Sequence, residues 1–279
     1  MAPERSGNND PATAQQQFQR HTLTFYDRIT SNNAARIRLW MRLKGLSSEF
    51  HIAYTTHDDQ VSDERFASIN PNRKIPLLLL EDGVTSIPES AVILQYLEER
   101  FASVPPSLLP ATPEGRAHMN LAIQYHDIYI SCFYVPPAPD VGVDDDCGGD
   151  ARRGLSPEMR AAKLADVWRQ LDVLESHCTC DPYLSGSTLS LADVTLLPTA
   201  FYVVYYGPRS FGWEDDAVWT GRPKLRGWYY DAMLELHEEA RTIVGGMREA
   251  LDGSADVRAR IDSIRRQTED HPRHKWIYP

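Results

Sequence analysis

Two short segments in the N-terminal third of the chain carry groups that could hold a small charged peptide. Ile75 precedes Pro76 just before a β-rich run. If that bond is cis, the preceding peptide turns outward and leaves the N–H and C=O of Ile75 free to pair with an added strand. Glu89 and Ser90 stand where a helix begins. Exposed N–H groups and the Ser90 hydroxyl suit a carboxylate there, and Glu89 suits an ammonium group.

No other constellation of residues competes with these segments. The sequence contains no GxGxxG, no Walker loop, no HExxH and no paired CxxC. The acidic run 144–146 with Asp150 lacks the alternation and the terminal Glu of an EF-hand, so we expect a solvated loop. The segment His177-Cys178-Thr-Cys180 is too compact for zinc and has no distant partner pair. We therefore predict no metal site.

Composition excludes several other classes of partner. The 279 residues include 29 Lys and Arg against 39 Asp and Glu, a formal charge of −10, which repels a phosphate backbone and argues against nucleic acid as a partner. No window reaches the length of apolar residues that spans a membrane, and the N-terminus has no apolar signal region. The four cysteines show no framework spacing, so we expect reduced thiols and a cytoplasmic protein.

Hydrophobic periodicity divides the chain into two parts. Residues 1–20 are polar and predict a disordered tail. The next part predicts a β-α-β-α-β-β-α order, with strands at 21–27, 50–56, 75–80 and 84–87 and helices at 34–46, 62–69 (opened by a capping Ser) and 91–101. Three prolines in residues 103–112 break both periodicities, which indicates an interdomain linker.

The second part is predicted to be helical. A helix capped by Thr112 runs to about residue 135, a Pro/Gly/Asp loop occupies 136–155, and further helices are expected over 157–177, 191–206, 223–251 and 253–267. Ser190 and Asp193 have the spacing of a capping box. The helix that they open is apolar nearly all round, which predicts the buried centre of this part.

This organisation resembles the cytosolic glutathione transferase superfamily, over roughly residues 22–250. The resemblance is carried by four motifs in a fixed order: SNNAARIR from Ser31, NPNRKIP from Asn70, Glu89-Ser90, and Ser190-Leu-Ala-Asp193. It implies an α/β thioredoxin-like domain followed by an all-α helical-bundle domain. The expected bounds are 21–102 for the first domain, 103–112 for the linker, 113–252 for the helical domain with its 136–155 insertion, and 253–279 for a C-terminal extension.

The resemblance also implies a ligand and the residues that bind it. Glutathione is the expected co-substrate, with its cysteinyl backbone paired to Ile75 beside Pro76. Members of the family bind the glycyl carboxylate at the positions that correspond to Arg73 and Lys74 of this chain. Glu89 and Ser90 would then take the γ-glutamyl end, so that each end of glutathione meets the opposite charge.

The thiol of glutathione needs an activating group, because free thiols titrate near pH ~8.5. In the family this group lies at the start of the first helix. Matching Arg36-Ile37-Arg38 to that helix places Ser31 at the activating serine of Ser-type members and Asn33 at a second contact. Tyr26 is the alternative, although the alignment puts it one residue away from the tyrosine of Tyr-type members.

The second substrate is expected to be a hydrophobic electrophile, bound by the first helix of the second domain. The candidate residues for this pocket are Tyr125, Ile128, Tyr129, Cys132 and Phe133. The resemblance implies a homodimeric, detoxifying enzyme that conjugates glutathione. β-Ether cleavage, reductive dehalogenation and isomerisation stay open, and SNNAARIR looks somewhat more like the etherase and fungal branches. A non-catalytic ligand-binding module is the alternative from another class.

Overall fold

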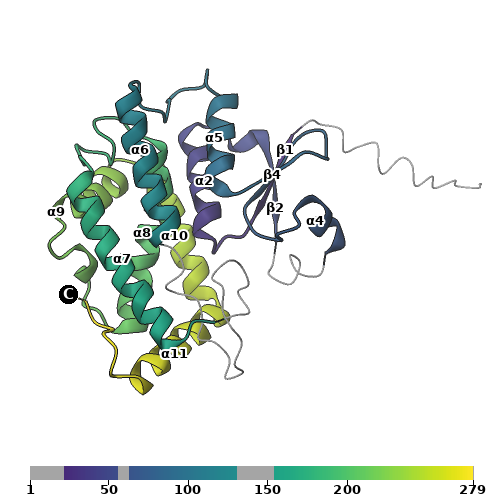
Figure 1. Cartoon of the computed structure of the whole chain (residues 1–279). Coiled ribbons are helices and arrows are strands. Elements are labelled where there is room, and N and C mark those ends of the chain that lie inside the picture. Colours follow the sequence, from purple (N-terminus) through teal and green to yellow (C-terminus); the bar gives the residue numbers. More distant parts are fainter. Residues whose placement is uncertain (1–21, 56–62, 131–153, 279) are drawn as a thin grey trace, which may run out of the picture.

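The computed structural model describes residues 22–55, 63–130 and 154–278. A small sheet flanked by helices forms the N-terminal part, and helices alone form the rest (Figure 1). The predicted fold class is therefore confirmed. The elements of the first part are β1 (Leu23–Asp27), α2 (Asn32–Leu43), η2 (Ser47–Glu49), β2 (Phe50–Tyr54), α4 (Glu64–Ile69), β3 (Leu77–Leu79), β4 (Ser86–Pro88) and α5 (Ser90–Arg100).

The helical part follows in the order that the sequence indicates. Its elements are α6 (Pro113–Tyr125), η3 (His126–Ile130), α7 (Pro157–His177), α8 (Leu191–Phe211), η4 (Ala217–Trp219), α9 (Pro223–Gly227), η5 (Trp228–Glu235), α10 (Glu238–Gly253) and α11 (Ala255–Asp270). In the residues described, no helix is long and apolar enough to cross a membrane.

The sheet has the strand order β2-β1-β3-β4. β1 runs parallel to β2 and antiparallel to β3, and β3 runs antiparallel to β4. Leu23, Phe25 and Asp27 are buried while the residues between them are less so, which is the alternation of a half-covered strand. Figure 1 shows α2 and α5 on the side of the sheet that faces the helical domain, and α4 on the other side.

Most helices begin at the capping residues that local sequence provides. The side chains of Ser31, Thr112 and Ser156 each accept a hydrogen bond from the first turn of α2, α6 and α7. The short helix α4 is an exception to the prediction, because its cap is Asp63, whose carboxylate accepts from the N–H groups of Arg65 and Phe66. The helix therefore begins later than the predicted 62–69, because the aspartate carboxylate caps it as well as a serine hydroxyl would.

Helix α8 is the buried centre of the helical domain, as predicted. Its capping box forms, with Asp193 accepting from the Ser190 N–H at 2.8 Å. The helix runs five residues further than the predicted end at Tyr206, to Phe211, and includes Pro198 and Pro208. An internal proline removes one backbone hydrogen bond of the helix, and burial of the helix on nearly all sides compensates for this loss.

The linker region between α5 and α6 is held by a buried ion pair of the first domain. Lys44 Nζ lies 3.2 Å from Glu98 Oε1 and donates to the carbonyls of Val104 and Pro106 at 2.7 and 2.9 Å. Glu98 also accepts from the backbone N–H of Leu108 at 2.8 Å. These bonds fix the path of the chain between the two domains.

The C-terminal extension packs on the helical domain. Helix α11 lies along α8. Beyond it, Trp276 and Tyr278 are buried, and Tyr278 packs on Trp168 of α7 with a centroid separation of 5.0 Å. The carbonyl of Trp276 accepts from Trp213 Nε1 at 2.7 Å. The predicted tail 1–20, most of the predicted loop 136–155 and the candidate residues Cys132 and Phe133 lie outside the described residues.

Candidate functional site

Sheet register brings the Glu89-Ser90 segment beside Ile75. Leu77 of β3 pairs with Pro88 of β4 in antiparallel register. The Ile75–Pro76 segment precedes β3 and the Glu89-Ser90 segment follows β4, so both leave the sheet next to this last pair. Ser90 is buried at the first position of α5, and Glu89 is exposed with φ 68° at its cap. The two segments that sequence analysis singled out therefore meet at one end of the sheet.

The same end of the sheet carries the start of the first helix. Tyr26 of β1 pairs with Leu77 of β3, so the end of β1 lies beside the segment that precedes β3. The chain then passes through a short loop to Ser31. The Ile75–Pro76 peptide is cis. Segments from three parts of the sequence thus surround one point at this end of the sheet.

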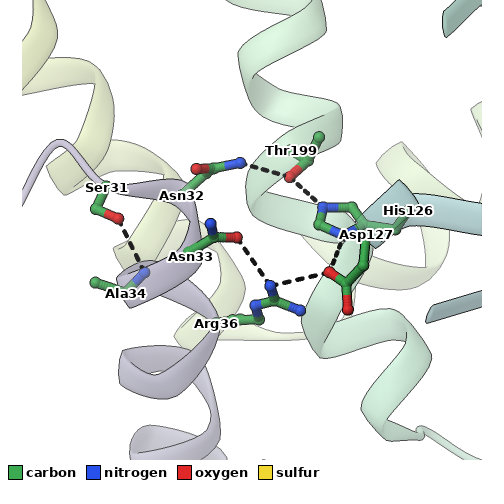
Figure 2. A network of polar contacts seen from close by, with 8 residues as sticks. All are labelled: Ser31, Asn32, Asn33, Ala34, Arg36, His126, Asp127 and Thr199. Atoms are coloured by element: carbon green, nitrogen blue, oxygen red, sulfur yellow. Dashed lines mark hydrogen bonds and ion pairs between the residues drawn. The ribbon is translucent and has the colours of Figure 1, made fainter. Parts of the chain in front are cut away.

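Ser31 is the N-cap of α2, and its side chain is nearly buried. Its Oγ accepts a hydrogen bond from the Ala34 N–H at 3.2 Å (Figure 2), which leaves the hydroxyl proton available to a ligand. The first turn of α2 contains no acidic residue, so the positive end of the helix dipole is not neutralised there. Both features favour an anion next to Ser31.

Asn33 lies one helical turn before Arg36 and is tied to it. Its Oδ1 accepts from Arg36 Nη2 at 2.9 Å, and the same nitrogen lies 3.0 Å from Asp127 Oδ1 on η3 (Figure 2). Among the described residues, Nε and Nη1 of Arg36 are buried without a hydrogen-bond partner. The Glu89 carboxylate is near enough to act on the Arg36 charge. Asn33 therefore lies at the edge of an interdomain charge cluster.

A second connection between the domains starts at Asn32. Its Nδ2 donates to Thr199 Oγ1 of α8 at 2.8 Å, and that oxygen lies 2.5 Å from His126 Nε2 (Figure 2). On the other side of the ring, His126 Nδ1 lies 2.8 Å from Asp127 Oδ1. These contacts form one continuous chain of polar groups between α2, α8 and η3.

Burial and charge determine the ionisation of this chain. Burial lowers the pKa of His126 below its ordinary value of 6.5, so the ring is neutral at pH 7. Burial acts to raise the pKa of Asp127, but the hydrogen bond from His126 and the charge of Arg36 outweigh it and lower that pKa. Asp127 is therefore a carboxylate that only accepts, which places the ring proton of His126 on Nδ1.

The loop before Ser31 contacts Tyr202 of α8, on which three arginines act. Tyr202 of α8 donates its hydroxyl to the carbonyl of Thr30. Burial raises the pKa of Tyr202, and the charges of Arg260, Arg28 and Arg38 act in the opposite direction. Of these three, Arg38 forms an ion pair with Asp27 at 2.5 Å, so its charge is balanced within the first domain.

Arg73 and Lys74 precede the cis peptide. The backbone N–H of Arg73 donates to the carbonyl of Asn70 at 2.9 Å, and Arg73 has a positive φ of 51°. The buried side chain of Asn70 donates from Nδ2 to the Lys74 carbonyl at 2.7 Å, and this bond holds the turn between the two residues. Lys74 is exposed, on the same segment as Ile75.

The remaining candidates point to different parts of the molecule. The ring of Tyr26 packs on Phe66 of α4 with a centroid separation of 5.4 Å, on the sheet face opposite α2. The ring of Tyr125 lies against His177 at the end of α7, at 6.2 Å. Ile128 and Tyr129 on η3 are exposed, beside Asp127.

Comparison with known families and proteins decides the assignment. Residues 25–107 match the model of the glutathione S-transferase N-terminal domain, and residues 157–229 match that of the glutathione S-transferase C-terminal domain. The chain is 30% identical over 227 residues to glutathione S-transferase theta-1 of Rattus norvegicus, covering 77% of this chain and 88% of that protein. The chain belongs to the glutathione S-transferase family. It is a glutathione-dependent transferase whose electrophile is unknown.

Solved structures share the fold of this transferase. Human glutathione transferase theta-2, solved in complex with glutathione, superposes with a TM-score of 0.62 at 20% identity, covering 92% of this chain and 94% of that chain. A β-etherase of Sphingobium sp. strain SYK-6 gives a TM-score of 0.61 at 23% identity, covering 80% and 99%. At these identities the likeness concerns architecture.

Sequence analysis of the transferase missed the polar chain behind Ser31. Asn32, Thr199 and His126 lie far apart in sequence, and only packing of α2 on α8 brings them together. One signal was present: Thr195 and Thr199 are polar positions in a helix that is otherwise apolar nearly all round. A polar side chain on a buried helix requires a hydrogen-bond partner. The sequence therefore predicts a hydrogen bond from this helix to another element, but it does not identify the partner residue.

Proposed function

We propose that Ser31 activates the glutathione thiol for attack on a hydrophobic electrophile. The observation that carries the proposal is the convergence of Ser31, the Ile75–Pro76 segment and the Glu89-Ser90 segment at one end of the sheet. Glutathione would pair its cysteinyl backbone with Ile75, which directs its thiol toward Ser31.

The charges of these segments match the two ends of glutathione. Glu89 would pair with the γ-glutamyl ammonium, and the Ser90 hydroxyl with the first N–H groups of α5 would take the γ-glutamyl carboxylate. Arg73 and Lys74, which precede the cis Ile75–Pro76 peptide, would bind the glycyl carboxylate. Asn33 would contact the ligand from the first turn of α2.

The chemistry follows from the hydrogen bonds of Ser31. Its oxygen already accepts from Ala34, so its proton is available as a donor. A hydrogen bond from that proton to the glutathione sulfur would stabilise the thiolate and let the thiol proton leave to solvent. The dipole of α2 favours the same charge, because the first turn of this helix holds no acidic residue. The thiolate then forms a C–S bond to the electrophilic carbon, and the leaving group departs with its electron pair.

The acceptor site is proposed next to η3. Ile128 and Tyr129 are exposed there, 59% and 41%, and offer apolar surface to a hydrophobic molecule. Tyr125, Cys132 and Phe133 belong to the same proposal, although the ring of Tyr125 lies against α7. β-Ether cleavage, dehalogenation and isomerisation use the same activated thiolate, so a panel of acceptors separates them.

A homodimer is proposed through the face formed by α5 and α6. A cavity of about 600 Å³ lies between these helices, with Met119 and Ile123 in its lining. Val92, also in its lining, and Leu121 on the same helices are exposed and would offer apolar surface to a second copy of the chain. Sedimentation of the wild type and of Val92→Asp tests this: a monomeric wild type contradicts the proposal.

For the location of the protein in the cell we propose the cytoplasm. This agrees with the free thiols of Cys178 and Cys180.

The test of the proposed chemistry is the thiolate absorbance of bound glutathione across pH. A hydrogen bond to a charged acceptor is worth about 1.5–3 kcal/mol, so the bound thiol should titrate about one to two units below the free thiol. Ser31→Ala should reverse most of that shift and slow turnover near neutrality about 10- to 100-fold, with little change in glutathione affinity. Asn33→Ala and Tyr26→Phe are measured in parallel. If neither they nor Ser31→Ala moves the titration, the activating role proposed for Ser31 is wrong.

A further inference from the structure

Both neighbours of Ser31 in the sequence are hydrogen-bonded to helix α8. The carbonyl of Thr30 accepts from the Tyr202 hydroxyl, and Asn32 Nδ2 donates to Thr199 Oγ1 at 2.8 Å. Thr199 and Tyr202 are three residues apart, so they lie on one face of α8. The helical domain therefore holds the chain immediately before and immediately after Ser31.

The rest of the loop before Ser31 is held from within the first domain. Arg38 donates to the carbonyls of Arg28 and Ile29 at 3.3 and 2.9 Å, and its Nη1 lies 2.5 Å from Asp27 Oδ1. The Ser31 N–H donates to the carbonyl of Arg28 at 2.8 Å. These bonds set the shape of the loop, whereas the α8 bonds set its place relative to the second domain.

The bond of Asn32 is the first of an ordered series. Asp127 is a carboxylate and accepts from His126 Nδ1–H, so His126 Nε2 carries no proton and accepts the hydroxyl proton of Thr199. The oxygen of Thr199 is then oriented to accept from Asn32. The donor and the acceptor of each hydrogen bond in the series are thus fixed, and this gives the Asn32 side chain a defined orientation.

We infer that Tyr202 and Thr199 are positioning residues for the reaction, holding Ser31 so that its hydroxyl points to the glutathione sulfur. The inference rests on the activating role proposed for Ser31. A hydrogen bond prefers an angle above about 150° and weakens steeply below about 120°, so a displacement of the Ser31 loop that bends this bond reduces thiolate stabilisation. Glutathione affinity depends on Ile75, Glu89 and Ser90, which α8 does not hold through these bonds.

The test compares Tyr202→Phe with Tyr205→Phe. Both remove one hydroxyl from the same helix, but Tyr205 donates to Asp252 Oδ1 at 2.8 Å, away from the loop. Tyr202→Phe should raise the pKa of bound glutathione by about 0.5–1 unit and lower kcat at pH 6.5 by about 3- to 10-fold, with the glutathione dissociation constant within about twofold of wild type. Tyr205→Phe should leave the thiol titration unchanged.

Thr199 provides a second, independent variant. Thr199→Val removes the hydroxyl with little change of shape and should raise the thiol pKa, whereas Thr199→Ser keeps the hydroxyl and should restore the wild-type titration. Asn32→Ala reaches the same bond from α2 without changing α8, so it stands in if Thr199→Val fails to fold. If Tyr202→Phe and these variants lose stability but keep the wild-type thiol titration, the contacts serve domain docking alone and the inference is wrong.

A double variant separates this inference from the proposed function. If Tyr202 acts through Ser31, Tyr202→Phe should have no further effect on the thiol titration in a Ser31→Ala background. Additive effects in the double variant contradict the inference and leave the proposed function intact. A Ser31→Ala titration equal to wild type contradicts both.

Discussion

Arg36 and Asp127 form a 3.0 Å ion pair that joins the first helix of the thioredoxin-like domain to the helical domain. The Arg36 side chain is almost fully buried, and Asp127 also accepts a hydrogen bond from His126 Nδ1–H. A guanidinium group in such a place depends on its carboxylate, because removal of one partner leaves an uncompensated buried charge. The pair therefore contributes to the rigidity of the interface behind the Ser31 loop.

Asp127→Asn should lower the free energy of unfolding by about 2 kcal/mol. Removal of one partner of a fully buried pair costs about 3–5 kcal/mol, and the 26% exposure of Asp127 reduces this. Urea denaturation measures the loss. Asp166→Asn is the control, since Asp166 and Arg169 form an exposed pair and the change should stay within about 0.5 kcal/mol. Equal losses in the two variants would contradict the prediction.

His126 should make stability fall as pH drops below about 6.5. Its pKa is lowered in the folded chain, so the unfolded chain binds more protons between the lowered value and 6.5 and stability is lost as pH decreases through that window. His126→Gln should remove up to about 1.4 kcal/mol per pH unit from this slope. Burial also lowers the pKa of His237, which contributes equally to both proteins. A slope unchanged by His126→Gln counts against the prediction.

Glu98→Gln should destabilise the chain by about 3–5 kcal/mol. Lys44 and Glu98 are both nearly inaccessible to solvent, and the carboxylate also accepts from Trp40 Nε1 at 2.7 Å. The neighbouring Glu99→Gln is the matched control, because Glu99 is exposed and its change should stay within about 0.5 kcal/mol. Thermal and chemical denaturation give the comparison. A loss below about 1 kcal/mol for Glu98→Gln would mean that Lys44 is sufficiently stabilised by the carbonyls of Val104 and Pro106.

Glu89→Gln should weaken glutathione binding about fivefold. The substitution keeps the size of the side chain and its backbone preference at φ 68° but removes the charge proposed to meet the γ-glutamyl ammonium. Because Glu89 is exposed, the expected cost is about 1 kcal/mol, below that of a buried pair. Calorimetric titration with glutathione measures it, with Glu64→Gln on α4 as the control. Equal dissociation constants for wild type and Glu89→Gln would remove Glu89 from the site.

Local sequence signals predicted most helices and strands, because capping and hydrophobic periodicity depend on residues within one or two helical turns. The helix 157–177 forms with the predicted bounds, opened by Ser156 and a proline at its first position. Predictions failed where distant packing outweighed local preference. Helix α8 continues through Pro208 because its surroundings bury it, and α6 passes into the π-helical turn η3 at His126 rather than continuing regularly.

The sequence by itself determined the two-domain architecture, and through the family resemblance it predicts the segments that would bind glutathione and Ser31 as the candidate activating residue. Each of these rests on residues close together in the chain or on motifs in a fixed order. Only the tertiary structure showed that Thr199 and Tyr202 hold the chain on either side of Ser31. A hydrogen bond across 167 residues depends on how α2 packs against α8, and no local propensity encodes the partner of a buried polar group.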